Sequence, residues 1–193
     1  DIEFEKIQTQ VEQVANARVM QVHQEKNIGV CLNLGVSQAR GKYWFKMDDD
    51  DFYGQNYLSD MVHLAEGADF HIMGKPPAFI YLEGEDRTYL RDNAIKNQNC
   101  IGNLGIPHLC GATLGGRRDN YPGFSENSRA CVDTDFVEDS RDMGQTVISC
   151  DIWNFIAFRA ADKSVHTWRH HDNSITKKAI PFAQGLDTSN TMI

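Results

Sequence analysis

Residues 43–51 read YWFKMDDDD, an apolar run followed by four consecutive aspartates. The apolar run is typical of a buried β-strand, so the aspartates stand at its carboxyl end. Four adjacent carboxylates repel one another, and folding alone gains little from packing them together. Ligands of open α/β sheets bind at the carboxyl ends of strands, and hard divalent cations are held by carboxylate oxygens. The stretch therefore predicts a ligand site, with a divalent cation as the ligand that suits residues 48–51.

Two other interpretations of this stretch stay open. One is a solvated acidic turn without a ligand. The other is an EF-hand loop counted from Asp49, which places Asp51 and Gly54 correctly. That loop would have Tyr53 and Asp60 where an oxygen ligand and a bidentate glutamate are expected, and a strand precedes it in place of a helix.

The segments around the aspartates alternate between helical and strand-like patterns. Helices are expected at 2–16, in the stretch that ends near Gly41, at 56–67 and at 133–144, and strands at 17–23, 43–47, 69–75, 78–85, 108–118, 146–150 and 154–158. Residues 85–106 give no clear pattern, and the final segment reads as polar and irregular. The sequence predicts one α/β domain over 1–193, with a mixed, mostly parallel central sheet, flanking helices and residues 171–193 as a polar C-terminal tail or lid.

Composition limits the classes of function. The 193 residues include 41% hydrophobic and 24% charged residues, which is typical of a soluble globular domain. The net charge of −8 argues against nucleic-acid binding, and no apolar run is long enough to cross a membrane. The five cysteines contain no CxxC pair, which favours reduced thiols and a cytosolic compartment.

Candidate residues outside the aspartate run each have a structural alternative. Asp133 is expected to be a helix N-cap and Asp135 a first-turn acid, either of which stabilises a helix without any catalytic role. His166, His170 and His171 could bind a metal ion, but histidines of this kind are more often surface or core residues.

The order of the motifs resembles the family 2 glycosyltransferases, which have the GT-A fold. The stretch NIGVCLNLGVSQARGKYWFKMDDDDFYGQNYL, residues 27–58, is similar to the family's Asn-x-Gly, Asn-x-Gly and Ala-x-Gly run, its hydrophobic strand and its Asp-x-Asp motif. CGATLGGRRDNYPGFSE resembles the acceptor-side strand and turn, and VDTDF falls where many members have Glu-Asp-Thr-Asp-Phe. NFIAFRAADKSVHTW resembles the late strand and His-Thr-Trp segment of bacterial members that build surface polysaccharides. The resemblance covers roughly residues 25–170.

The resemblance implies transfer of a sugar, with inversion, from a nucleotide-diphosphate donor of UDP or GDP type to a carbohydrate or lipid-linked acceptor. A divalent cation, Mn²⁺ or Mg²⁺, would assist the reaction. Cytoplasmic localisation follows, with possible peripheral association at the inner face of the membrane and no transmembrane segment. The implied site residues are Asn27, Gly29, Asn33, Asp48 and Asp49 for the donor; Asp50 and His166 for the metal, with Asp48 as a further candidate ligand; and Asp133 as general base, with Asp135 as the fallback.

Three departures from the family pattern are visible. Val132 replaces the glutamate that usually precedes the base, and Leu32 stands where an arginine often precedes the asparagine. The family's first strand, ending in Pro-x-Tyr-Asn, and its second, ending in Asp-Asp-Gly-Ser, are not in this sequence, so the first β-α-β unit is expected to be missing. Two further classes therefore stay open: an inactive nucleotide-sugar-binding module and a metal-dependent phosphoryl-transfer enzyme.

Overall fold

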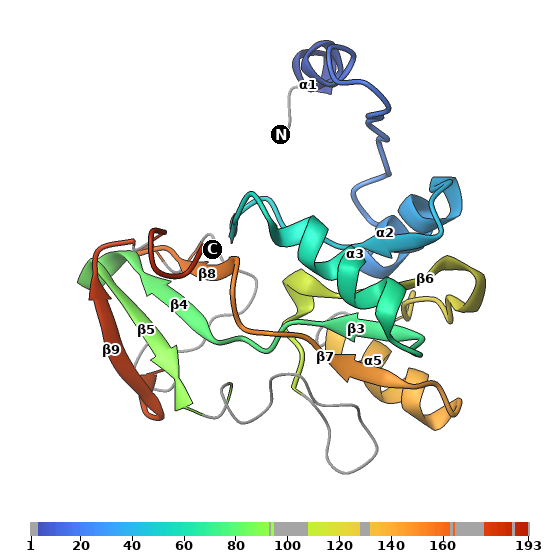
Figure 1. Cartoon of the computed structure of the whole chain (residues 1–193). Helices are drawn as coiled ribbons and strands as arrows, with labels where there is room; N and C mark the ends of the chain where they lie inside the picture. Colours follow the sequence, from blue (N-terminus) through green and yellow to red (C-terminus); the bar gives the residue numbers. More distant parts are fainter. Residues whose placement is uncertain are drawn as a thin grey trace.

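The computed structural model describes residues 4–92, 94, 108–127, 132–162, 164, 176–186 and 188–192. Its helices are α1 (Phe4–Val11), α2 (Ile28–Gln38), α3 (Tyr57–Gly67) and α5 (Val132–Asp142), with 3-10 turns η1 (Glu83–Glu85), η2 (Gly111–Thr113) and η3 (Arg118–Asn120). The strands form two sheets (Figure 1). The four-stranded sheet has the order β1 (Tyr43–Phe45), β6 (Gly115–Arg117), β3 (Ile72–Gly74), β7 (Val147–Ser149). The five-stranded sheet has the order β2 (Phe52–Tyr53), β8 (Phe155–Arg159), β4 (Phe79–Leu82), β5 (Arg87–Arg91), β9 (Ala179–Gln184).

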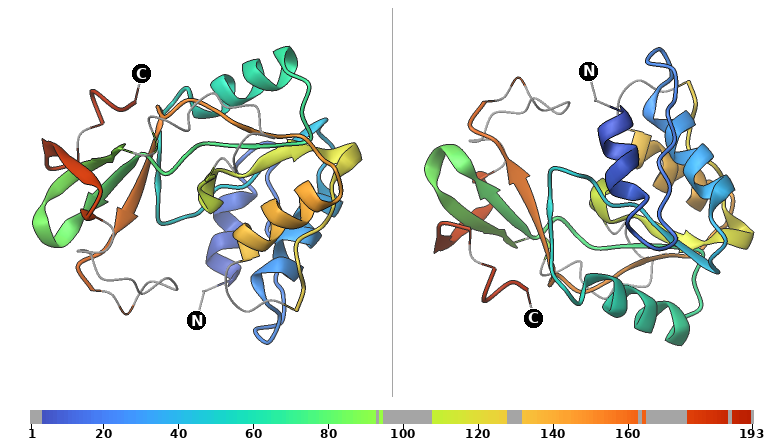
Figure 2. Two further views of the ribbon diagram at one scale, coloured as in Figure 1. Left: turned by 90° about the horizontal axis from the view of Figure 1, so that it is seen from below. Right: turned by 90° about the horizontal axis from the view of Figure 1, so that it is seen from above.

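The four-stranded sheet is the middle layer of a three-layer arrangement (Figure 2). One face packs against α2 and α5, in a core that includes Trp44, Ile72 and Phe136. The other face packs against α3, whose Tyr57 and Met61 are fully buried. Successive side chains of a strand point to opposite faces, so β1, β3 and β7 each supply residues to both cores. Helix α1 has no buried residue and lies apart from these layers (Figure 1).

The α/β class expected from the sequence is confirmed, but the sheet arrangement needs a correction. The described strands form two sheets and not one central sheet. The pairs β3–β7 and β4–β8 are parallel. The pairs β1–β6, β2–β8, β3–β6, β4–β5 and β5–β9 are antiparallel. The sheets are therefore mixed but not mostly parallel.

The strand expected at 108–118 is limited to β6, with η2 before it and η3 after it, and two other local expectations were wrong. Residues 17–23 were expected to be a strand, but they carry no strand, because no described strand lies beside them to complete a ladder. Residues 179–184 were expected to be irregular, yet they form β9 at the edge of the five-stranded sheet. Their partner β5 lies in the segment that gave no clear pattern, and only its Thr88 and Leu90 are buried.

Helix α2 is fastened to the loop that follows η3. The side-chain oxygen of Asn27 accepts the Val30 N–H at 3.1 Å and so caps the helix. A Cβ on the buried Gly29 would overlap the carbonyl oxygen of Ser125, so only glycine allows the loop to come this close. We use the name α2–loop clamp for the contacts of residues 27–33 with residues 121–126.

Substitution of Gly29 by alanine tests the α2–loop clamp. Gly29→Ala should destabilise the protein by about 2 kcal/mol or more, because the loop backbone must move away from the new methyl group. Gly35, in the same helix, is the matched control, since a Cβ there would meet nothing within 4 Å. Gly35→Ala should stabilise the helix by up to about 1 kcal/mol. Urea unfolding measures both changes, and equal effects of the two substitutions would contradict the close approach.

Candidate active site

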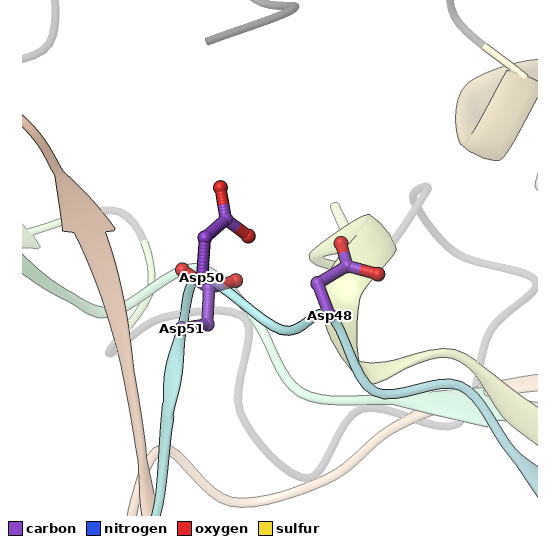
Figure 3. A group of neighbouring side chains, drawn as sticks. All are labelled: Asp48, Asp50 and Asp51. Carbon is purple, nitrogen blue, oxygen red and sulfur yellow. The ribbon is translucent and has the colours of Figure 1, made fainter. Parts of the chain in front are cut away.

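The four aspartates lie where the chain leaves one sheet for the other. Strand β1 of the four-stranded sheet ends at Phe45, and β2 of the five-stranded sheet begins at Phe52. Asp48, Asp50 and Asp51 each offer a carboxylate oxygen within 4.8 Å of the others (Figure 3). We call these three residues the aspartate triad; Asp49 is not one of them.

Backbone and side-chain hydrogen bonds hold the triad in place. The hydroxyl of Tyr53 accepts the Asp48 N–H at 2.8 Å and donates to the Ala112 carbonyl at 2.8 Å. Asp51 accepts the N–H of Phe158, in β8, at 2.8 Å. The triad is therefore tied both to η2 and to the five-stranded sheet.

Lys46 contributes a positive charge that the sequence interpretation did not consider. Its Nζ lies 2.5 Å from Oδ1 of Asp48, and its side chain is only 7% exposed. The burial of Lys46 could have been predicted from the sequence, because alternation along the strand places it on the same buried face as Trp44. A lysine at a buried position of such a pattern indicates a partner of opposite charge within reach of its ammonium group.

The environment of the triad disfavours a charged Asp51. Burial, and next the negative charges of Asp50 and Asp48, raise the pKa of Asp51 to about 7. The hydrogen bond from Phe158 and the charge of Lys46 oppose this shift. A carboxyl group held in its neutral form by these causes would become charged if a cation bound beside it.

Asp133 shares this electrostatic environment although it lies far along the sequence. It is the second residue of α5, so its expected role as N-cap is wrong. Its carboxylate packs against Gly111 of η2, where a Cβ would overlap it. Burial raises the pKa of Asp133, Lys46 lowers it and Asp48 raises it further. Asp133 therefore lies close enough to Lys46 and Asp48 for their charges to act on it.

The sequence was compared with known protein families and with curated proteins. The sequence profile described as Glycosyl transferase family 2 matches residues 4–122, more than half of the chain. The chain belongs to glycosyltransferase family 2. It is therefore a glycosyltransferase that uses a nucleotide-sugar donor, and its mixed α/β structure is consistent with a GT-A-like fold. The matched span contains the triad and ends before α5.

A search of curated proteins finds no match. Among the described residues, no helix has the length and apolarity to cross a membrane.

Three donor-site candidates of this family 2 glycosyltransferase belong to the α2–loop clamp. Asn33 accepts from the Tyr121 hydroxyl at 2.6 Å and from the Phe124 N–H at 2.8 Å. It donates to the Phe124 carbonyl at 3.0 Å and to Glu126 at 2.9 Å. All four hydrogen-bonding positions of the amide are therefore occupied by the loop. Asn27 and Gly29 contact the same loop, so the structure gives all three residues a structural role.

The remaining candidates have different outcomes. Val132, which departs from the family pattern, is buried in the core between α5 and the four-stranded sheet. An ionised glutamate at that buried position would lose its hydration, and this cost explains why an apolar residue stands there. Asp135 is half-buried on the same helix. His166, His170 and His171 lie outside the described residues.

The raised pKa of Asp51 predicts a pH dependence of stability. In the unfolded chain this carboxyl titrates near 3.8, and in the folded protein near 7. Between these values the folded state retains a proton that the unfolded state has lost, so the metal-free protein loses stability as the pH rises from about 4 to about 7. Asp51→Asn should remove this contribution and be more stable than the parent above pH 7. Urea unfolding from about pH 5 to about pH 8 with a chelator present measures it, and Asp49→Asn is the control. A parent and an Asp51→Asn variant with the same slope would contradict the prediction.

Proposed function

We propose that this family 2 glycosyltransferase is a metal-dependent, inverting enzyme. It transfers a sugar from a nucleoside-diphosphate donor, of UDP or GDP type, to a hydroxyl group of a carbohydrate or lipid-linked acceptor. The observation that carries the proposal is the aspartate triad together with the Asp133 carboxyl, which packs against Gly111 of η2 and whose pKa is shifted by the charges of Lys46 and Asp48. One group of carboxylates suits a cation, and a separate, half-buried carboxyl suits proton transfer.

The triad fits a divalent cation by the chemistry of its donor atoms. Its carboxylate oxygens lie within 4.8 Å of one another, and hard cations prefer oxygen ligands. Asp50 and Asp51 would hold the ion together with Asp48, and His166 is a further proposed ligand. When bound, Mn²⁺ or Mg²⁺ would neutralise charge on the diphosphate leaving group. Manganese is the better match if His166 takes part, since imidazole suits transition metals more than magnesium.

Asp133 is the proposed general base. The acceptor hydroxyl attacks the anomeric carbon, its proton passes to the Asp133 carboxylate, and the bond from that carbon to the diphosphate oxygen breaks. Attack from the side opposite the leaving group inverts the anomeric centre. Burial raises the pKa of Asp133, which brings its basicity closer to the working pH and makes it a better proton acceptor. Asp135 is the alternative base on the same helix.

The remaining assignments follow from family membership and the sequence resemblance. Asp48 and Asp49 would face the ribose or sugar of the donor. The resemblance to bacterial members with a His-Thr-Trp segment favours a role in polysaccharide or glycoconjugate synthesis. Such a role places the enzyme in the cytoplasm, with peripheral contact at the inner face of the membrane where lipid-linked acceptors are located.

Thermal melting tests the proposed cation site. Mn²⁺ at a hundredfold excess over its dissociation constant should stabilise the parent by about 2.7 kcal/mol, because it binds only the folded triad. Asp50→Ala should remove this gain, whereas Asp49→Ala should keep it, since Asp49 is outside the triad. A nucleoside diphosphate should enlarge the shift in the parent. Equal shifts with Mn²⁺ in the parent and in Asp50→Ala would mean that the ion binds elsewhere.

Turnover with a panel of nucleotide sugars tests the proposed base. In the presence of Mn²⁺, Asp133→Asn should lower kcat by about a hundredfold or more while donor affinity, measured by calorimetry, stays unchanged. Asp135→Asn is the matched control and should change kcat by less than about tenfold. A larger loss in Asp135→Asn would transfer the role to that residue. Donor binding by the parent without turnover would support a binding module, and phosphate release without sugar transfer would support phosphoryl transfer.

A further inference from the structure

Lys46 holds a charge inside the site that the proposed mechanism does not use. Its backbone N–H donates to the Leu114 carbonyl at 2.7 Å, which fixes the residue just after β1. Its ammonium lies 2.5 Å from Asp48 Oδ1, and the lysine side chain is 7% exposed against 37% for the aspartate. The buried member of this ion pair is thus the lysine.

Separating a buried ammonium group from its partner of opposite charge costs free energy. A lysine side chain removed from water loses its hydration, and an opposite charge at hydrogen-bond distance compensates for that loss. Lys46 also lowers the pKa of both Asp51 and Asp133, so its charge acts on carboxyl groups other than that of Asp48. One oxygen of Asp48 is therefore already engaged by a positive charge before any cation arrives.

We propose that Lys46 is an internal counter-ion that competes with the divalent cation for Asp48. This inference rests on the proposed metal dependence and adds a positioning residue to it. The ammonium offsets the repulsion among the three carboxylates and keeps Asp48 in place in the metal-free protein. The positive charge of Lys46 repels the divalent cation, so the triad binds that cation weakly in the absence of a nucleotide. A diphosphate group supplies negative charge of its own, and cation binding therefore becomes favourable mainly together with the donor.

Titration with Mn²⁺, followed by the electron paramagnetic resonance signal of the free ion, tests this proposal. Lys46→Met keeps most of the side-chain volume and removes the charge. It should bind Mn²⁺ alone at least about tenfold more tightly than the parent, because a like charge a few ångströms away has been removed. Lys46→Arg keeps the charge and should bind like the parent. Lys42→Met, at an exposed lysine next to the same strand, is the control for loss of surface charge.

A second titration includes UDP and, in a separate experiment, GDP. UDP or GDP should increase the Mn²⁺ affinity of the parent more than that of Lys46→Met, because the variant no longer depends on the added negative charge. Equal or weaker binding of Mn²⁺ by Lys46→Met would overturn the proposal, since Lys46 would then only organise the triad. The same increase with nucleotide in both proteins would also count against it.

Two further variants separate failure of the counter-ion from failure of the cation site. Asp50→Ala should weaken Mn²⁺ binding in both the parent and the Lys46→Met background; if it weakens neither, the cation site itself is wrong, whatever Lys46 does. Asp48→Asn removes the contested oxygen charge, and in that background Lys46→Met should have a much smaller effect on Mn²⁺ affinity. An undiminished effect of Lys46→Met in that background would show that the competition does not take place at Asp48. If Lys46→Met alone does not fold, comparison of Asp48→Asn with the double variant still measures the coupling.

Discussion

One phenol group connects the parts of the site. The Tyr53 hydroxyl accepts from the backbone of Asp48 and donates to the Ala112 carbonyl, so the turn of aspartates and η2 share a single bridging oxygen. The Asp133 carboxylate packs against Gly111, the neighbouring residue of η2. Burial raises the pKa of Tyr53, which keeps the hydroxyl protonated and able to donate. The spacing between the triad and the proposed base therefore depends on this bridge.

The site balances charge in the absence of a cation by two means. Lys46 supplies a positive charge at Asp48, and the raised pKa of Asp51 lets that carboxyl take up a proton. Both means reduce the mutual repulsion of carboxylates that lie within 4.8 Å of one another. A cation would replace the proton at Asp51, and this exchange couples metal binding to pH.

The sequence could predict what depends on neighbours along the chain. The strand that ends at the aspartates, helix α3 and the α/β class all follow from local periodicity, and they are confirmed. The inclusion of Asp51 in the triad depends on Phe158 of β8, and this distant contact leaves no local pattern. Strands β5 and β9 were missed because they bury few side chains, and β9 also because its partner β5 is distant along the chain. The contacts of Asn33 with the loop after η3 could not be predicted, because the spacing of residues along the chain does not show them.

The pairing of β2 with β8 has a consequence for the order in which the chain folds. Strand β2, which follows the aspartates, pairs with residues 155–156 of β8. Its hydrogen bonds can therefore form only after most of the chain has been synthesised. Contacts between such distant segments form late, because a large loop must first be closed. During synthesis on the ribosome, the aspartates therefore stay in water, where their repulsion is weak and screened by salt. Asp51 is fixed next to Asp48 and Asp50 only when β8 is in place to donate its hydrogen bond.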